Sequence, residues 1–163
     1  MNVEQGFNSV EAVWPVWSWH GFASLNARGV HEILALRQEV FIIEQNCIYQ
    51  DADSYDGISL HLTGRDENGD IVAYARLIPP GCRFDEPSVG RLLTIKEQRR
   101  AGLATEVMRR AISRSLAEYP RHPIAVSAQL YLKDFYHRLG FMVKGEPYDE
   151  DGILHVDMLL PVK

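Results

Sequence analysis

Apolar residues along the chain recur with two different periods, and these predict alternating strands and helices. The first alternating run, at residues 13–19, contains Pro15, which is typical of an edge strand. Similar runs follow at intervals as far as the C-terminus. Strands are predicted at residues 13–19, 59–65, 71–78, 88–95, 124–127, 141–144 and 154–160.

Three stretches have helical spacing instead. The first begins after Asn26, a suitable N-cap, and continues to about Glu44, with apolar residues at positions 30, 33, 34 and 41. A long amphipathic helix begins at Leu103 and ends before Pro120. A shorter helix is predicted at residues 131–139, where a glycine follows as the expected stop.

The order of these elements predicts a mixed sheet. Asn68-Gly69 lies between two alternating runs and is typical of a hairpin, so the flanking strands are antiparallel. The next strand, the long helix and the strand at residues 124–127 require a right-handed parallel crossover. Helices on both faces of a mixed sheet follow. Residues 45–57 have no period and are expected to form an ordered loop.

Length and composition indicate one globular domain. The 163 residues are 46% hydrophobic and 24% charged, which favours a single domain over 1–163 with a loose segment at residues 1–11. Cys47 and Cys82 are too few for a disulfide framework. The sequence has no secretory signal and no run of about 20 apolar residues, so we expect a cytoplasmic protein that does not enter a membrane.

The charge pattern favours a small anionic ligand. A net charge of −5 argues against nucleic acid as a partner, because such binding depends on neutralising phosphates. Against this acidic background, four arginines form a local basic cluster on one segment. They are Arg99, Arg100, Arg109 and Arg110.

The turn before the long helix has the features of an anion site. Its sequence is Arg99-Arg100-Ala101-Gly102-Leu103-Ala104. The first N–H groups of a helix are unpaired and carry partial positive charge, and a glycine lets the backbone approach a phosphate closely. The glycine patterns of a P-loop and of a dinucleotide-binding turn are absent. Taken alone, the turn fits either a phosphate site or an ordinary helix start with surface arginines.

Two motifs in order make the chain similar to a known superfamily. Arg-x-x-Gly-x-Ala at residues 99–104 resembles the acetyl-CoA pyrophosphate loop of the GNAT N-acetyltransferases, and residues 135–141 resemble their Tyr-x-x-Leu-Gly-Phe element. The resemblance is sharper with the ElaA-type GNAT proteins and extends from about residue 14 to residue 160. It rests on residues 37–47, 49–51, Asp53, Asp56, 73–77, 86–91, 127–129, 145–146 and 150–155.

The resemblance implies a fold and a co-substrate. The GNAT fold is α/β (α+β), with a mixed, mostly antiparallel sheet of six to seven strands, helices on both faces and a splayed parallel strand pair in the middle. Acetyl-CoA would place its pantetheine arm between the splayed strands, which a β-bulge can open; no metal is implied. The expected cofactor-binding residues are Leu93, Thr94, Ile95, Arg99, Arg100, Ala101, Gly102, Leu103, Ala104, Thr105 and Gln129.

Two positions depart from the superfamily pattern. Ala104 stands where many relatives have a second glycine, and Arg100-Ala101 stands where Gly-Lys is common. The second departure removes a lysine and moves the expected phosphate-binding charge to Arg100.

The implied chemistry is direct attack of an amine on the thioester in a ternary complex. A backbone N–H at Leu93 or a neighbour would stabilise the oxyanion. Tyr136 matches the general acid that protonates the leaving thiolate, and Tyr131 is its only close rival. For the base, Glu44, His155 and the loop aspartates all remain candidates, and none is preferred. The loop aspartates are Asp51, Asp53 and Asp56.

Three arginines occupy places where a charge is unusual. Arg37 falls on or near the apolar face of its helix, while Arg76 and Arg91 interrupt strands. They fit buried salt bridges or the recognition of an anionic group on the substrate. The salt-bridge partners expected from the sequence are Glu39, Glu44 and Asp56.

Two other functions remain open beside an N-acetyltransferase. One is a non-catalytic acetyl-CoA sensor or interaction module. The other is an acyltransferase similar to acyl-homoserine-lactone synthases, which the helix-to-loop stretch faintly resembles. The acceptor is expected to be a small-molecule or peptide amine, whose identity the sequence leaves open. Exposed strands at both ends of the sheet allow a homodimer.

Overall fold

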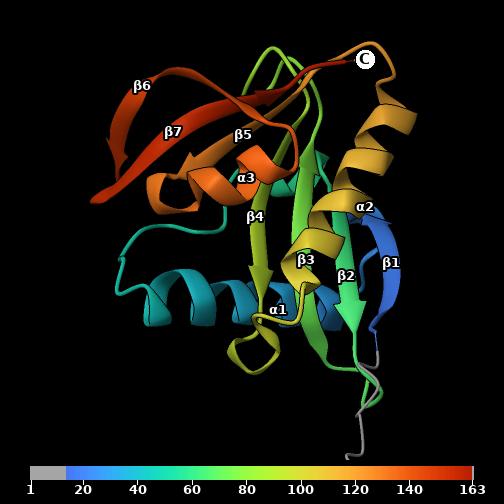
Figure 1. Cartoon of the computed structure of the whole chain (residues 1–163). Coiled ribbons are helices and arrows are strands. Elements are labelled where there is room, and N and C mark those ends of the chain that lie inside the picture. Colours follow the sequence, from blue (N-terminus) through green and yellow to red (C-terminus); the bar gives the residue numbers. More distant parts are fainter. Residues whose placement is uncertain (1–13, 163) are drawn as a thin grey trace, which may run out of the picture.

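The computed structural model describes residues 14–162, so the segment at residues 1–11 lies outside the described residues. A seven-stranded sheet in the order β1-β2-β3-β4-β5-β7-β6 forms its centre (Figure 1). Neighbouring strands are antiparallel except β4 and β5, which run parallel. The strands are β1 Val16–Gly21, β2 Leu60–Arg65, β3 Ile71–Ile78, β4 Ser88–Thr94, β5 Ile124–Gln129, β6 Met142–Glu150 and β7 Ile153–Leu160.

Helices cover both faces of this sheet, as predicted (Figure 1). The α-helices are α1 Ala27–Arg37, α2 Leu103–Glu118 and α3 Lys133–Arg138. On one face, α2 and α3 pack onto the larger hydrophobic core, to which Val107, Met108 and Phe141 contribute. On the other face, Ile33 and its neighbours in α1 form a second core against the middle strands. We call these two sides the α2 face and the α1 face.

The first helix continues beyond α1 as a π-helical segment, η2 Gln38–Glu44, so it ends where the sequence predicted. Asn26 caps its start by accepting a hydrogen bond from the Gly29 N–H at 2.8 Å. Wider π turns are common at functional sites. Here the π segment brings Glu44 to Arg99, after β4, and the next residue, Gln45, to Gln129 at the end of β5.

Two strand boundaries differ from the prediction by three residues or more. The N-terminal edge strand begins at Val16 rather than at residue 13, because Pro15 cannot donate to the ladder. Strand β6 continues to Glu150 rather than stopping at residue 144. Gly145, at φ +84°, forms an irregularity after which pairing with β7 resumes at Tyr148. Gly145 therefore lies in a bulge within β6 rather than beyond its end.

The parallel pair in the middle is splayed, as the resemblance implied. Strands β4 and β5 share one registered pair, Ser88 with Ala125, at their beginnings. Farther along β4, Arg91 takes φ +54°, and residues 91 and 92 together lie opposite the single residue Ala75 of β3. This β-bulge bends β4 and opens it away from β5.

Candidate active site

The turn before α2 presents unpaired backbone donors. Gly102 is the N-cap residue of α2, at φ +81°, a conformation that favours glycine. Within residues 14–162, this N-cap position provides no side-chain hydrogen bond to the start of the helix. The first hydrogen bond of the helix runs from the Glu106 N–H to the Gly102 carbonyl, at 3.2 Å. The N–H groups of residues 103–105 therefore face outward without a helical partner, which suits a phosphate.

Arg100 also takes a left-handed conformation, at φ +68°. Glycine adopts this conformation without a steric penalty, whereas a residue with Cβ pays about 1–2 kcal/mol. The left-handed backbone thus gives a physical reason for the glycine common at this position in the superfamily. In this chain Arg100 takes the left-handed conformation with its strain, and its guanidinium adds a positive charge at the turn.

Arg99 connects the turn to the end of the first helix. Its Nη2 donates to a Glu44 carboxylate oxygen at 2.7 Å, and its Nε donates to the Thr94 carbonyl at 3.2 Å. The Glu44 carboxylate therefore already has a cationic partner in this structure.

The backbone of β4 shows which N–H groups face the splayed gap. The Ile95 N–H donates to the Val72 carbonyl of β3 at 3.0 Å. Because successive residues in a strand alternate direction, the main-chain groups of Leu93 and Ile95 face β3, and those of Thr94 face the β5 side. The Thr94 carbonyl, which bonds Arg99 rather than β3, agrees with this. Of the residues expected near the oxyanion, Thr94 is the one with a suitably directed N–H.

Gln129 lies at the end of β5, on the other side of the gap. Its amide Nε2 donates to the Gln45 Oε1 at 3.0 Å, so the segment after the first helix contacts both sides of the splayed pair. In the sheet register, Gln129 lies opposite His155 of β7. The structure thus brings together Thr94, Arg99, Glu44, Gln129 and, one strand farther, His155.

Tyr136 lies on α3, which packs against β5. Its side chain is buried and packs edge-to-face on Phe135 and Phe141, with ring centroids 5.1 and 5.7 Å away. Burial, with a smaller contribution from Tyr131, raises the pKa of Tyr136, so the phenol keeps its proton throughout the neutral range. No hydrogen bond of its hydroxyl occurs among residues 14–162. Tyr131, the rival candidate, is 72% exposed.

His155 has a fixed tautomer. Its Nδ1 lies 2.8 Å from the Ile153 carbonyl, which can only accept, so Nδ1 carries the proton in the neutral ring. The Nε2 lone pair is then free to accept a proton, and the Glu150 carboxylate lies 3.9 Å away. The ring also stacks on Tyr148, with centroids 6.2 Å apart. A neutral, oriented imidazole of this kind fits a general base.

The loop aspartates, which were candidates for the base from the sequence, hold the three unusual arginines. Arg37 donates to Asp51 at 2.7 Å and to Asp56 at 2.6 Å. Arg76 pairs with Asp53 and Asp56, and Arg91 pairs with Asp51 and Asp53. The prediction of Asp56 as a salt-bridge partner is confirmed. The prediction of Glu39 and Glu44 as partners of these three arginines was wrong. Three cations and three carboxylates thus form a nearly buried, charge-balanced network.

The charges within this network outweigh desolvation. Burial by itself raises the pKa of Asp56, but the hydrogen bonds and charges of Arg37 and Arg76 hold that pKa below its ordinary value. Asp56 therefore remains ionised at neutral pH, and all three aspartates are occupied by arginines, which removes them as candidates for the base.

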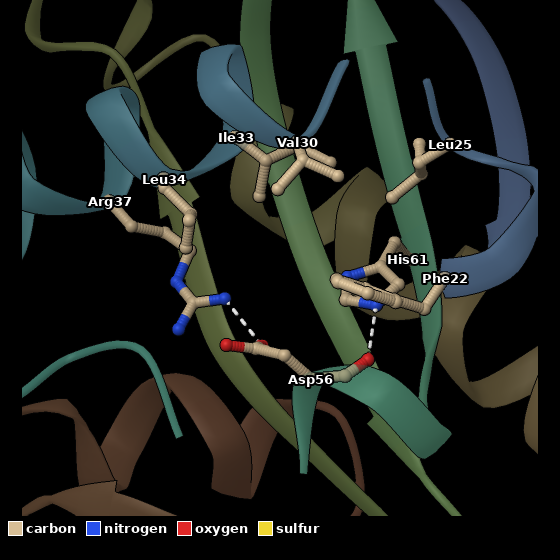
Figure 2. Close-up of a pocket in the computed structure, with 8 residues that line it drawn as sticks. All are labelled: Phe22, Leu25, Val30, Ile33, Leu34, Arg37, Asp56 and His61. Carbon is tan, nitrogen blue, oxygen red and sulfur yellow. Dashed lines mark hydrogen bonds and ion pairs between the residues drawn. The ribbon is translucent and has the colours of Figure 1, made fainter. Parts of the chain in front are cut away.

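His61 lies beside the network, on the α1 face. Figure 2 shows its ring between Phe22 and Asp56, at the edge of a cavity of about 10 Å³. A cavity of this volume holds one water molecule at most. The His61 Nε2 donates to the Asp56 carbonyl at 2.9 Å, and its Nδ1 accepts from the Tyr74 hydroxyl at 2.7 Å.

This arrangement predicts a pH-dependent stability. Burial lowers the pKa of His61 below its ordinary value, so the unfolded state binds a proton more readily. Stability is therefore fully present above about pH 6.5 and is lost as the pH falls below that value, by at most about 1.4 kcal/mol per pH unit. In His61→Gln, unfolding free energies measured by urea titration between pH 5 and 7 should fall less steeply. Parallel curves for the two proteins would contradict this assignment.

A larger cavity, of about 200 Å³, opens between the first helix and the following loop. None of the expected cofactor-binding residues lines it. Its lining residues are Leu34, Gln38, Ile42, Tyr49, Gln50, Asp51 and Ala52.

Among residues 14–162 there is no helix long and apolar enough to cross a membrane. The same part of the chain has no group of three or more His, Cys, Asp or Glu side chains placed to hold a metal ion.

A hydrogen-bonded group on the C-terminal strands was missed by the sequence interpretation. Ser127 of β5, Tyr148 of β6 and Asp157 of β7 are linked side by side on the sheet. The available signal was the period-2 spacing of Ser127 with Gln129 and of His155 with Asp157, which places each pair on one face.

Comparison with known proteins identifies the family. A family model described as an acetyltransferase (GNAT) domain matches residues 26–161. The UPF0039 protein sll0451 of Synechocystis is 47% identical over 146 residues, which is 90% of this chain and 95% of that protein.

Solved structures agree in fold and sequence. An acyl-CoA N-acyltransferase from Pseudomonas aeruginosa superposes with a TM-score of 0.84 at 33% identity, covering 89% of this chain and 98% of that one. ElaA of Escherichia coli gives 0.82 at 31% identity over the same shares. A CoA-dependent acyl-homoserine lactone synthase, BjaI, gives 0.71 at 16% identity over 90% of this chain and 83% of that one, a likeness that shows the fold alone.

Proposed function

The chain belongs to the GNAT acetyltransferase family, among the ElaA-type proteins, and on this premise we propose that it transfers an acetyl group from acetyl-CoA to an amine. The observation that carries the proposal is an uncapped helix N-terminus beside an open, splayed strand pair. The first fits a pyrophosphate and the second fits the pantetheine arm.

The turn residues would bind the cofactor through backbone and charge. The N–H groups of residues 102–105 would donate to the pyrophosphate, and Arg100 would add a charge-assisted contact. Arg99 would keep its bond with Glu44 and donate to a phosphate oxygen through its remaining nitrogen, Nη1. Gln129, on the β5 side of the gap, would donate to or accept from the pantetheine amides.

The reaction would then proceed by direct attack. The Thr94 N–H would stabilise the oxyanion as the amine nitrogen forms a bond to the thioester carbon. As the C–S bond breaks, the Tyr136 hydroxyl would donate its proton to the sulfur, and the proton lost by the amine would go to a base. The products are the acetamide and free CoA thiol, so no acyl-enzyme is needed.

We assign the base to His155, because its Nε2 lone pair is free while Glu44 and the loop aspartates hold arginines. His155→Gln should lower kcat/KM about 10- to 30-fold at pH 7. The loss should shrink above pH 9, where the amine deprotonates without help. Glu44→Gln is the matched control and should lose less than about threefold, because Glu44 positions Arg99. A larger loss in Glu44→Gln than in His155→Gln would contradict the assignment.

An acetyl-CoA-dependent thiol-release assay across polyamines, amino acids, aminosugars and N-terminal peptides tests the proposal. We expect release with at least one amine, at a rate well above the hydrolysis of acetyl-CoA alone. Binding of acetyl-CoA without release from any acceptor would favour the sensor function instead.

A further inference from the structure

The α1 face of the C-terminal strands carries a connected row of polar side chains. Ser127 Oγ lies 2.5 Å from the Tyr148 hydroxyl, which lies 2.8 Å from Asp157 Oδ1. Gln129 and His155 share this face, because they stand two residues from Ser127 and Asp157 on their strands. All five side chains are partly exposed. The row therefore begins beside the splayed gap and is open to solvent.

The direction of the hydrogen bonds shows what this row lacks. A carboxylate can only accept, so Tyr148 donates to Asp157 and Ser127 in turn donates to Tyr148. The lone pairs of Ser127 and the second oxygen of Asp157, Oδ2, are then left as acceptors. No hydrogen bond to Oδ2 occurs in the described part of the chain. These acceptors can therefore bind hydrogen-bond donors of a ligand.

The charges around the row leave Asp157 without a cation. Within residues 14–162, no basic nitrogen lies within 4.0 Å of its carboxylate. Lys144, opposite Asp157 in the register, pairs with Glu86 at 3.3 Å, and Arg83 pairs with Glu150 at 3.1 Å. Residues 142–160 contain five carboxylates and one lysine, which is most of the chain's net charge of −5. A partly buried, unpaired carboxylate in a negative field favours a cationic ligand.

We propose that this row binds the acceptor, and that the acceptor is an aliphatic diamine or polyamine whose second ammonium group is held by Asp157. The inference rests on the proposed function. Strands are about 4.8 Å apart, so a thioester lying in the gap beside β5 is about two strand spacings from β7. The Asp157 side chain and the thioester itself extend across part of that distance. The remaining distance between the thioester carbon and the carboxylate matches a short alkyl chain with a nitrogen at each end.

Three acceptors of the same chain length test this inference: 1,4-diaminobutane, 4-amino-1-butanol and 4-aminobutanoate. Each presents the same primary amine with a second group that is cationic, neutral or anionic. The wild-type kcat/KM should be at least about tenfold higher for the diamine than for the amino alcohol, as expected for a charge-assisted contact. The value for 4-aminobutanoate should be lower still.

In Asp157→Asn, the preference for the diamine over the amino alcohol should fall about tenfold or more. Glu146→Gln removes the same charge from the same hairpin at an exposed position, and its preference should stay within about twofold of wild type. Thermal unfolding of both variants checks that the fold is retained.

Four outcomes would overturn the inference, and a fifth would overturn the proposed function. A higher wild-type kcat/KM for the amino alcohol or for 4-aminobutanoate than for the diamine would overturn the inference by itself, before any variant is measured. An unchanged preference in Asp157→Asn, or an equal loss in Glu146→Gln, would remove Asp157 as the specific partner. Thiol release from no amine of the wider panel, with acetyl-CoA bound, would overturn the proposed function itself, whereas release without preference for cations overturns this inference alone.

Discussion

Tyr136→Phe should lower kcat about 100- to 1,000-fold, the usual contribution of a general acid, and change the Kd for acetyl-CoA less than twofold. The substitution removes one hydroxyl, which has no hydrogen-bond partner within residues 14–162, and it leaves the packing on Phe135 and Phe141 in place. Burial keeps the phenol protonated at neutral pH, so a proton is available for the thiolate. Thiol release gives kcat, and isothermal titration gives the Kd.

Tyr131→Phe is the matched control, since it removes the same group from the neighbouring tyrosine at an exposed position. Its kcat should stay within about threefold of wild type. If Tyr136→Phe retains the wild-type kcat, or if the larger loss occurs in Tyr131→Phe, Tyr136 is not the acid. Equal turnover in all three proteins would require another proton donor to the sulfur.

Arg37→Met should destabilise the fold by about 3–5 kcal/mol, because it leaves the buried carboxylates of Asp51 and Asp56 without a shared cation. Arg37 is 1% exposed and lies at the centre of the network. For a chain of this length the expected fall in Tm is about 10 °C or more. Urea unfolding at pH 7.5, monitored by circular dichroism, measures the change in free energy.

Arg28→Met provides the comparison for this prediction, because Arg28 forms an exposed ion pair with Glu32 one turn along α1. Its Tm should equal that of the wild type. A loss in Arg37→Met no larger than in Arg28→Met would mean that water or a rearranged side chain replaces the missing charge. The network would then contribute little to the stability of the fold.

Local patterns predicted most of the secondary structure correctly. Strand β3 was predicted with its observed ends, because each of its residues is buried and a hairpin turn precedes it. The predicted helix start at Asn26 is confirmed by its cap, and Gly140 is left-handed at φ +95°, as expected. The larger errors concerned the start of β1, near Pro15, and the end of β6, beyond Gly145. Proline and glycine can each lie inside a strand or outside it. Hydrogen bonding to the neighbouring strand decides which of the two occurs.

Apart from the pairing of Asp56 with arginines, contacts between distant segments could not be predicted. The loop aspartates have no periodicity and resemble a solvated segment, yet Arg76 and Arg91, 20 or more residues away, draw Asp51 and Asp53 inward. The pair between Glu44 and Arg99 joins residues 55 apart. Such contacts depend on how the π-helical end of the first helix lies over the sheet, which hydrophobic spacing does not encode.

The cofactor half of the site could be proposed from the sequence, because the anion-binding turn is a local structure of a strand, a glycine and a helix start. The acceptor half could not. Its row of Ser127, Tyr148 and Asp157 comes from three strands that pair only in the folded sheet. The choice of Thr94 over Leu93 likewise required the hydrogen bond between Ile95 and Val72.

A crystal structure of the complex with acetyl-CoA would show where the cofactor binds. We expect a pyrophosphate on the N–H groups of residues 102–105 and a pantetheine arm between β4 and β5. We also expect a thioester carbonyl oxygen about 3 Å from the Thr94 nitrogen, and a sulfur about 3.5 Å from the Tyr136 hydroxyl. A cofactor bound away from the splayed strands, or one whose sulfur lies beyond the reach of Tyr136, would contradict this expectation.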